Sequence, residues 1–113
     1  MVLSYPCNPT GAVLTKNDKD KLHGLIKNKN ILVITDEIYS SLVFEDEYHS
    51  VAQYEDIKNK VIFVSGFSKM FSMTGLRLGY VCAHTDLISS IIKVHQYAVS
   101  CAPSVVQWGA FEG

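Results

Sequence analysis

Two short apolar runs constrain the fold of this chain more than any other feature of its sequence. Residues 31–35 read ILVIT, and residues 61–64 read VIFV. Continuous apolar runs of this length, rich in β-branched side chains, predict strands that are covered on both faces, as in a parallel sheet. Residues 1–5 predict a further short strand, which ends at a turn rich in proline and glycine. The expected fold class is therefore α/β.

The segments between these strands predict helices and irregular connections. Thr15, followed three residues later by an acid, has the form of a helix start, and that helix should end near residues 28–30. Residues 40–54 are mixed and acidic, which predicts irregular structure with at most a short helix. Residues 78–83 alternate apolar and small side chains like another strand. Asp86 predicts the N-cap of a second long helix.

This order of elements predicts one mostly parallel, helix-flanked sheet. The 25 residues between the predicted strands at 1–5 and 31–35 suffice for a right-handed crossover. The 113-residue chain begins inside a strand pattern and ends inside a helical one. We therefore expect residues 1–113 to be one partial domain, a piece of something larger.

The composition excludes several classes of partner. Ten basic and eleven acidic residues give a net charge of −1 with no block of like charge, so neither nucleic acid nor a membrane surface is expected to bind. The longest apolar run is far too short to cross a membrane. Three widely spaced cysteines argue against a disulfide framework and against a zinc or other metal site. A reducing cytoplasm is the expected setting.

Polar side chains follow each of the three predicted strands. Asn8 follows the first, Asp36 and Tyr39 follow the second, and residues 65–69 follow the third. Ligands of open α/β sheets bind beyond the carboxyl ends of the strands. If the three strands are parallel neighbours, these side chains converge on one edge of the sheet.

The third of these segments has reactive groups. Lys69 lies just past the strand at 61–64, and Arg77 follows eight residues later. Desolvation disfavours the charged form of an amine, and an uncharged amine can form a Schiff base with a carbonyl. A guanidinium offers a fork that matches a phosphate. An aldehyde that carries a phosphate would suit this pair.

Each residue also has a purely structural interpretation. A turn asparagine, a helix-capping aspartate, a core tyrosine and a surface lysine are all common. Asn8 could be only a turn residue and Asp36 only a helix cap. Tyr39 could be a core residue and Lys69 a surface residue, and Arg77 could pair with one of the acids at 45–47.

The joint pattern resembles the class I/II aminotransferases, the fold-type I enzymes that use pyridoxal 5'-phosphate (PLP). Three blocks in the right order carry the resemblance. They are NPTG at 8–11, DEIY at 36–39, and GFSK at 66–69 continuing to GLRLG at 75–79. The resemblance covers nearly the whole chain, and it implies that the chain is part of the PLP-binding large domain.

The resemblance assigns the reacting groups. Lys69 would form the Schiff base with PLP and, once a substrate amine displaces it, serve as the general base. Asp36 would face the pyridine nitrogen and keep it protonated, so that the ring can draw electrons.

The remaining contacts to the cofactor are implied in the same way. Asn8 and Tyr39 would hydrogen-bond the phenolic oxygen of PLP, whereas Arg77 and Ser68 would bind its phosphate. Many family members carry a phosphate-binding serine three residues before the lysine, where this chain has Gly66, a variant that the family also shows.

The implied activity is transfer of an amino group between an amino acid and a 2-oxo acid, by a cytoplasmic homodimer. The resemblance also implies that an N-terminal segment and the small domain that selects the substrate lie outside this chain, so the piece alone is expected to be inactive. Two alternatives stay open. One is another fold-type I enzyme, such as a carbon–sulfur β-lyase or a cyclopropane-forming synthase. The other is a non-catalytic PLP-binding domain of a transcription regulator.

Overall fold

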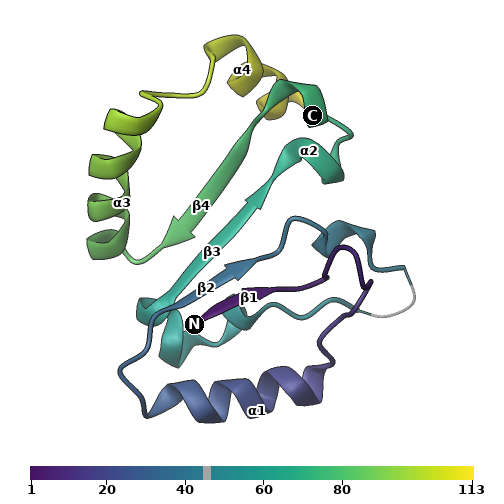
Figure 1. Cartoon of the computed structure of the whole chain (residues 1–113), viewed down its shortest axis with the longest axis vertical. Helices are drawn as coiled ribbons and strands as arrows, with labels where there is room; N and C mark the ends of the chain where they lie inside the picture. The colour runs from purple at the N-terminus through teal and green to yellow at the C-terminus, as the bar shows by residue number, and fades with distance from the viewer. Residues whose placement is uncertain (45–46) are drawn as a thin grey trace.

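The computed structural model describes residues 1–44 and 47–113, and its centre is a four-stranded sheet (Figure 1). The strands follow the chain in spatial order, β1-β2-β3-β4; β1, β2 and β3 are parallel, and β4 is antiparallel to β3. Their bounds are Val2–Ser4, Val33–Asp36, Val61–Gly66 and Gly79–Ala83. This topology confirms the α/β class and the mostly parallel sheet.

Four α-helices and four short 3-10 helices connect and flank the strands in the described ranges. The α-helices are α1 (Lys16–Lys27), α2 (Phe67–Met70), α3 (Thr85–Ala98) and α4 (Ser104–Glu112). The 3-10 helices are η1 (Ser40–Leu42), η2 (Val51–Gln53), η3 (Glu55–Lys60) and η4 (Thr74–Leu76). In Figure 1, α1 lies below the strands, whereas α3 and α4 lie beyond β4.

The core lies where α1, η2 and η3 pack against the sheet. Its buried members come from the helix, both 3-10 turns and two strands: Ile26, Val33, Val51, Ile57 and Val61. Helix α1 begins as predicted, because the Thr15 hydroxyl accepts from the Asp18 backbone N–H and the Asp18 carboxylate accepts from that of Thr15.

The covering of β2 differs from the sequence-based prediction. Val33 and Thr35 are buried, but Ile34 between them is 38% exposed. Within the described residues the sheet is thus covered on one face at β2, not on both. The reason is that α1, η2 and η3 pack on the same side, whereas α3 contacts β4.

The start of α3 also differs. The helix begins at Thr85, and the N-cap is His84, whose Nδ1 accepts from the Asp86 backbone N–H at 3.4 Å. Asp86 instead lies in the first turn, where a carboxylate complements the positive end of the helix dipole. An imidazole with a free lone pair substitutes here for the usual capping oxygen.

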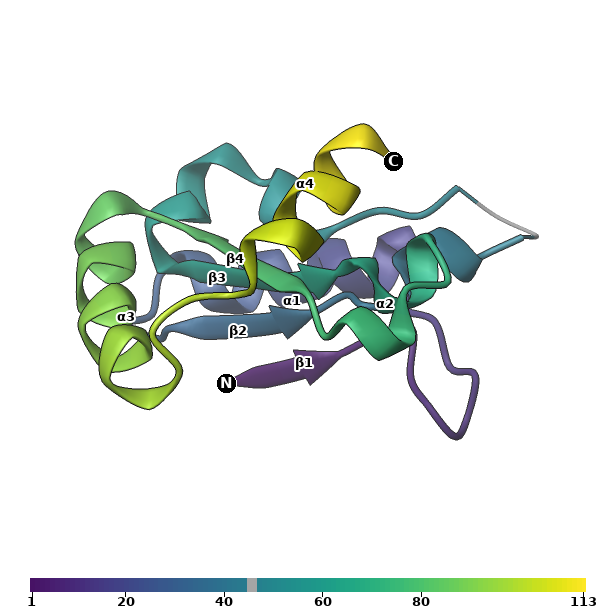
Figure 2. The same ribbon diagram turned by 90° about the horizontal axis from the view of Figure 1, so that it is seen from above.

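The parallel register brings the carboxyl ends of the first three strands together. Asp36 lies beside Ser4 of β1 and Val64 of β3. Figure 2 shows that the connection from β1 to α1 and the helix α2 both lie at this end of the sheet. Across the described ranges, no helix is long and apolar enough to cross a membrane. The same ranges contain no cluster of metal-ligating side chains.

Candidate functional site

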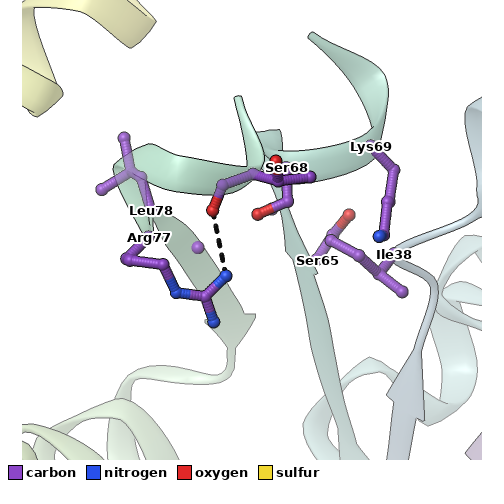
Figure 3. A pocket seen from close by; sticks show the side chains of 9 residues that line it. Ile38, Ser65, Ser68, Lys69, Arg77 and Leu78 are labelled. Carbon is purple, nitrogen blue, oxygen red and sulfur yellow. Dashed lines mark hydrogen bonds between the residues drawn. The ribbon is translucent and has the colours of Figure 1, made fainter. Parts of the chain in front are cut away.

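A cavity of about 430 Å³ opens beyond the carboxyl end of β3 (Figure 3). Three of the predicted residues, Ser68, Lys69 and Arg77, line it. The other lining residues are Ile38, Ser65, Gly66, Thr74, Leu78 and Gly79. An amine, a guanidinium and hydroxyl groups therefore border one space, although Lys69 and Arg77 come from different turns.

Local backbone geometry places these groups. Strand β3 continues directly into the single turn of α2, which sets the half-buried Lys69 near the end of the strand. Arg77 follows η4 in the left-handed region, at φ 55°, and its Nη1 donates to the Thr74 carbonyl at 3.0 Å. The alternative partners of Arg77 are the acids at 45–47. Glu45 and Asp46 lie outside the described residues, and the described Glu47 forms no salt bridge with Arg77.

Gly66 allows the close approach of β3 and β4 at this cavity. A Cβ placed there would be 2.9 Å from the Leu78 carbonyl oxygen and 3.1 Å from the Gly79 Cα. It would also be 3.2 Å from the Ile38 side chain. A serine at this position would therefore require the β4 backbone to shift, which gives a steric reason for glycine here.

We expect Gly66→Ala to lower the free energy of unfolding by about 1–3 kcal/mol, the usual cost of overpacking against backbone. Gly75→Ala is the matched control, since a Cβ at Gly75 meets nothing within 4 Å, and its effect should stay within about 0.5 kcal/mol. Urea unfolding of both variants checks this. Equal stability of the two variants would contradict the steric argument.

Two further residues predicted for the site, Asn8 and Tyr39, contact each other and form a second cluster. The Asn8 Nδ2 donates to the Tyr39 hydroxyl at 3.1 Å, across 31 residues of sequence. The turn that carries Asn8 is closed by a 2.8 Å bond from the Gly11 N–H to the Cys7 carbonyl, with Gly11 at φ 70°. Both Asn8 and Tyr39 line a second hollow of about 300 Å³.

Tyr39 also connects this hollow to Lys69. The Lys69 Nζ lies 5.5 Å from the centre of the Tyr39 ring, within the range of a cation–π contact. The two clusters are therefore neighbours at the same end of the sheet.

Asp36 lies at this end, but its carboxylate has a local partner. Its Oδ1 accepts from the Ile38 backbone N–H at 3.1 Å. Asp36 is not among the residues that line either hollow. The structure thus brings Asp36 to the predicted edge of the sheet and places its side chain in a turn there.

Sequence reasoning did not select Thr74 or Ile38 as lining residues. Thr74 fixes Arg77 through its carbonyl, a role that no side-chain motif indicates. Ser65 is buried and lines the cavity, and its hydroxyl donates to the Glu37 carbonyl at 3.5 Å.

Comparison with known proteins decides the family. The family model described as "Aminotransferase class I and II" matches residues 1–112. The chain belongs to the class I and II aminotransferase family. The aspartate aminotransferase of Sulfolobus acidocaldarius is 43% identical over 110 residues, which is 97% of this chain and 28% of that protein.

Solved aminotransferase structures share the fold. The aromatic aminotransferase from Pyrococcus horikoshii superposes with a TM-score of 0.90 at 38% identity, covering 96% of this chain and 30% of its own. The aspartate aminotransferase of Thermotoga maritima gives 0.89 at 34% identity, covering 96% and 29%. The chain thus spans less than a third of the length of these PLP-dependent relatives.

Proposed function

We propose that the protein binds PLP and transfers an amino group between an amino acid and a 2-oxo acid. The observation that carries the proposal is the cavity beyond β3, where the amine of Lys69 and the guanidinium of Arg77 border one space. Membership of a PLP-dependent family supports it. The donor set also fits the cofactor, because PLP combines an aldehyde, which reacts with an amine, and a phosphate, which pairs with a guanidinium.

We assign phosphate binding to Arg77 and Ser68. Both line the cavity, and Arg77 is exposed, with one guanidinium nitrogen already held by Thr74. Holding one nitrogen orients the remaining N–H donors before any ligand arrives, which reduces the entropy lost on binding.

We assign the ring contacts to Asn8, Tyr39 and Asp36. Asn8 and Tyr39 already share a hydrogen bond, so they would present an amide and a hydroxyl together to the phenolic oxygen of PLP. A carboxylate at Asp36 would hold the proton on the pyridine nitrogen. The hydrogen bond that the Asp36 carboxylate accepts from the Ile38 N–H would hold the carboxylate in place.

Lys69 would act as both anchor and base. When bound, PLP supplies an electron-withdrawing ring that stabilises negative charge on the substrate Cα. The Lys69 Nζ would hold the cofactor covalently, release it to the substrate amine, and then move the Cα proton as general base. Tyr39, 5.5 Å away, would limit where the freed amine can go.

We further propose that residues 1–113 are part of the large domain of a longer, homodimeric, cytoplasmic enzyme. The short span relative to the relatives supports this, as do large exposed apolar side chains at Tyr97, Trp108 and Phe111. Three free cysteines fit a reducing compartment. Substrate choice would then depend on residues outside this chain.

Product analysis of the whole protein tests the reaction. An aminotransferase yields a 2-oxo acid together with amine transfer to a second 2-oxo acid, such as 2-oxoglutarate. A β-lyase would instead release pyruvate and ammonia from a sulfur amino acid. Candidate donors include aspartate and aromatic amino acids, which the names of two relatives suggest. PLP binding without either reaction would favour the non-catalytic alternative.

We expect Arg77→Gln to weaken PLP binding about 10- to 100-fold, because it removes a charged hydrogen-bonding partner worth about 1.5–3 kcal/mol. Binding of pyridoxal, which lacks the phosphate, should be unchanged. Fluorescence titration with both ligands measures the ratio. Lys58→Gln, on an exposed lysine of η3, is the control and should affect neither. Equal loss for both ligands would contradict a phosphate role for Arg77.

A further inference from the structure

Two charged side chains that belong to neither cluster, Glu37 and Lys19, are buried behind the candidate site. Glu37 is 1% exposed, although it lies between Asp36 and Tyr39 in sequence. Its Oε1 accepts from the Thr35 hydroxyl at 2.9 Å and from the Ser50 hydroxyl at 2.8 Å. A buried carboxylate is costly unless donors and a positive charge compensate for the lost water.

Helix α1 contributes a buried positive charge, the ammonium of Lys19, which can compensate for the Glu37 carboxylate. Lys19 is also 1% exposed, and its ammonium donates to the His49 carbonyl and lies 3.9 Å from the centre of the Tyr48 ring. Burial lowers the pKa of Lys19, and the negative charge of Glu37 acts in the opposite direction. No buried side-chain polar atom of the described residues lacks a hydrogen-bond partner.

Glu37 links β3 to the segment that carries Tyr39. Its backbone N–H donates to the Val64 carbonyl at 2.9 Å, and its own carbonyl accepts from the Ser40 N–H at 3.0 Å. Tyr39 lies between Glu37 and Ser40, whose backbones these two bonds hold, so a shift of Glu37 would move the Tyr39 phenol with it.

Tyr48 extends the network to the Asn8 turn. Its hydroxyl donates to the Tyr5 carbonyl at 3.1 Å, three residues before Asn8. Burial raises the pKa of the Tyr48 phenol, and the negative charge of Glu37 adds to this. The phenol therefore remains a hydrogen-bond donor. The same network thus reaches the segments on both sides of the Asn8–Tyr39 contact.

We infer that Glu37 and Lys19 are positioning residues that hold Asn8 and Tyr39 in contact from behind the sheet. The inference rests on the proposed PLP site, because the contact matters to function only if those two side chains bind the cofactor. Neither charged group lines the cavity or the second hollow. They act through the backbone segments that they anchor.

The test is a double-mutant cycle on the whole protein. PLP dissociation constants are measured for Glu37→Gln, Tyr39→Phe and the double variant. We expect Glu37→Gln to weaken binding about tenfold on its own, and by less than about threefold when Tyr39 is already phenylalanine. Such non-additivity shows that Glu37 acts through Tyr39. Fully additive losses, or no loss, would overturn the inference.

Two further variants separate positioning from general destabilisation. Asp56→Asn removes a carboxylate that lies 2.9 Å from the Lys27 ammonium of α1, on an exposed surface, and it should leave PLP binding unchanged. Glu37→Gln could fail to fold, in which case the isosteric Thr35→Val replaces it. Thr35→Val removes the hydroxyl that donates to the Glu37 Oε1, and it should weaken PLP binding about threefold. Unchanged binding by Thr35→Val would then overturn the inference.

A readout without cofactor completes the design. In the PLP-free protein, Glu37→Gln should speed hydrogen exchange at the Ser40 amide, which bonds to the Glu37 carbonyl. Unchanged exchange would argue against the positioning role. Borohydride trapping of PLP on wild-type Lys69 checks the proposed function separately. Failure to trap overturns the PLP site and this inference with it, whereas trapping with additive losses overturns the inference alone.

Discussion

Replacing Lys69 with alanine is expected to abolish the covalent link to PLP and lower the rate of amine transfer by at least about 10⁴-fold. The variant loses the nucleophile and the general base together, and acid–base catalysis alone contributes about 10²- to 10⁴-fold. The visible absorption band of the bound cofactor should disappear as well. Absorption spectra follow the band, and borohydride reduction followed by mass spectrometry of the peptide that carries residue 69 detects the link. Steady-state kinetics measures the rate.

Two controls sharpen this experiment. Lys69→Arg keeps a long basic side chain beside Tyr39, but a guanidinium cannot form the covalent link, so this variant should fail like Lys69→Ala. Lys58→Ala, on the exposed surface of η3, should behave like wild type. A Lys69→Ala protein that still forms a borohydride-reducible link would show that another amine is the anchor.

The second large effect is expected at Asp36. Asp36→Ala should reduce kcat about 10³-fold or more, because it removes the charge proposed to stabilise the protonated ring as negative charge develops. Tyr39→Phe removes one hydrogen-bonding hydroxyl, and it should cost only about tenfold. Steady-state kinetics of both variants, under saturating PLP, makes the comparison.

Asp36→Asn separates charge from local structure. The asparagine side chain would keep an oxygen to accept from the Ile38 N–H, which the wild-type carboxylate does at 3.1 Å. It carries no negative charge, so the kcat of Asp36→Asn should fall nearly as far as that of Asp36→Ala. If Asp36→Asn retained nearly full activity, or if Asp36→Ala and Tyr39→Phe were equally slow, the ring-nitrogen role would be wrong.

The sequence pattern predicted which segments form strands, but not which face of a strand is buried. The apolar runs at 31–35 and 61–64 identified β2 and β3, because β-branched apolar side chains favour an extended backbone wherever they are packed. The same runs did not reveal that Ile34 is left 38% exposed. Which face is covered depends on where α1, η2 and η3 pack, and a run that is apolar throughout contains no information on that choice.

Of the two long helices, the sequence predicted the start of α1 correctly and the cap of α3 wrongly. The start of α1 was predictable, since a capping box involves two residues three positions apart in the chain. At α3, the sequence offered Asp86 as the usual acidic cap, whereas the His84 imidazole reached the Asp86 N–H instead. The choice depended on the rotamer of one side chain, which propensity does not determine.

The order of polar residues after the strands was determined by the sequence itself. Asn8, Asp36 and Lys69 each follow a strand or end it, and parallel strands necessarily bring those ends to one edge. The tertiary structure alone decided which of them meet. Asn8 bonds to Tyr39, Lys69 shares a cavity with Arg77, and Asp36 bonds to Ile38.

Lys19 shows most clearly the difference between what the sequence determines and what the tertiary structure decides. In the sequence it lies in a charged, helix-forming stretch and resembles any surface lysine. In the fold it is buried and bonded to the His49 carbonyl, 30 residues away. Local structure follows from neighbours in the chain, so the sequence by itself determined the elements and the polar groups at their ends. Contacts between distant segments follow from sheet register and packing, which is why the burial of Glu37 and Lys19 became visible only in the fold.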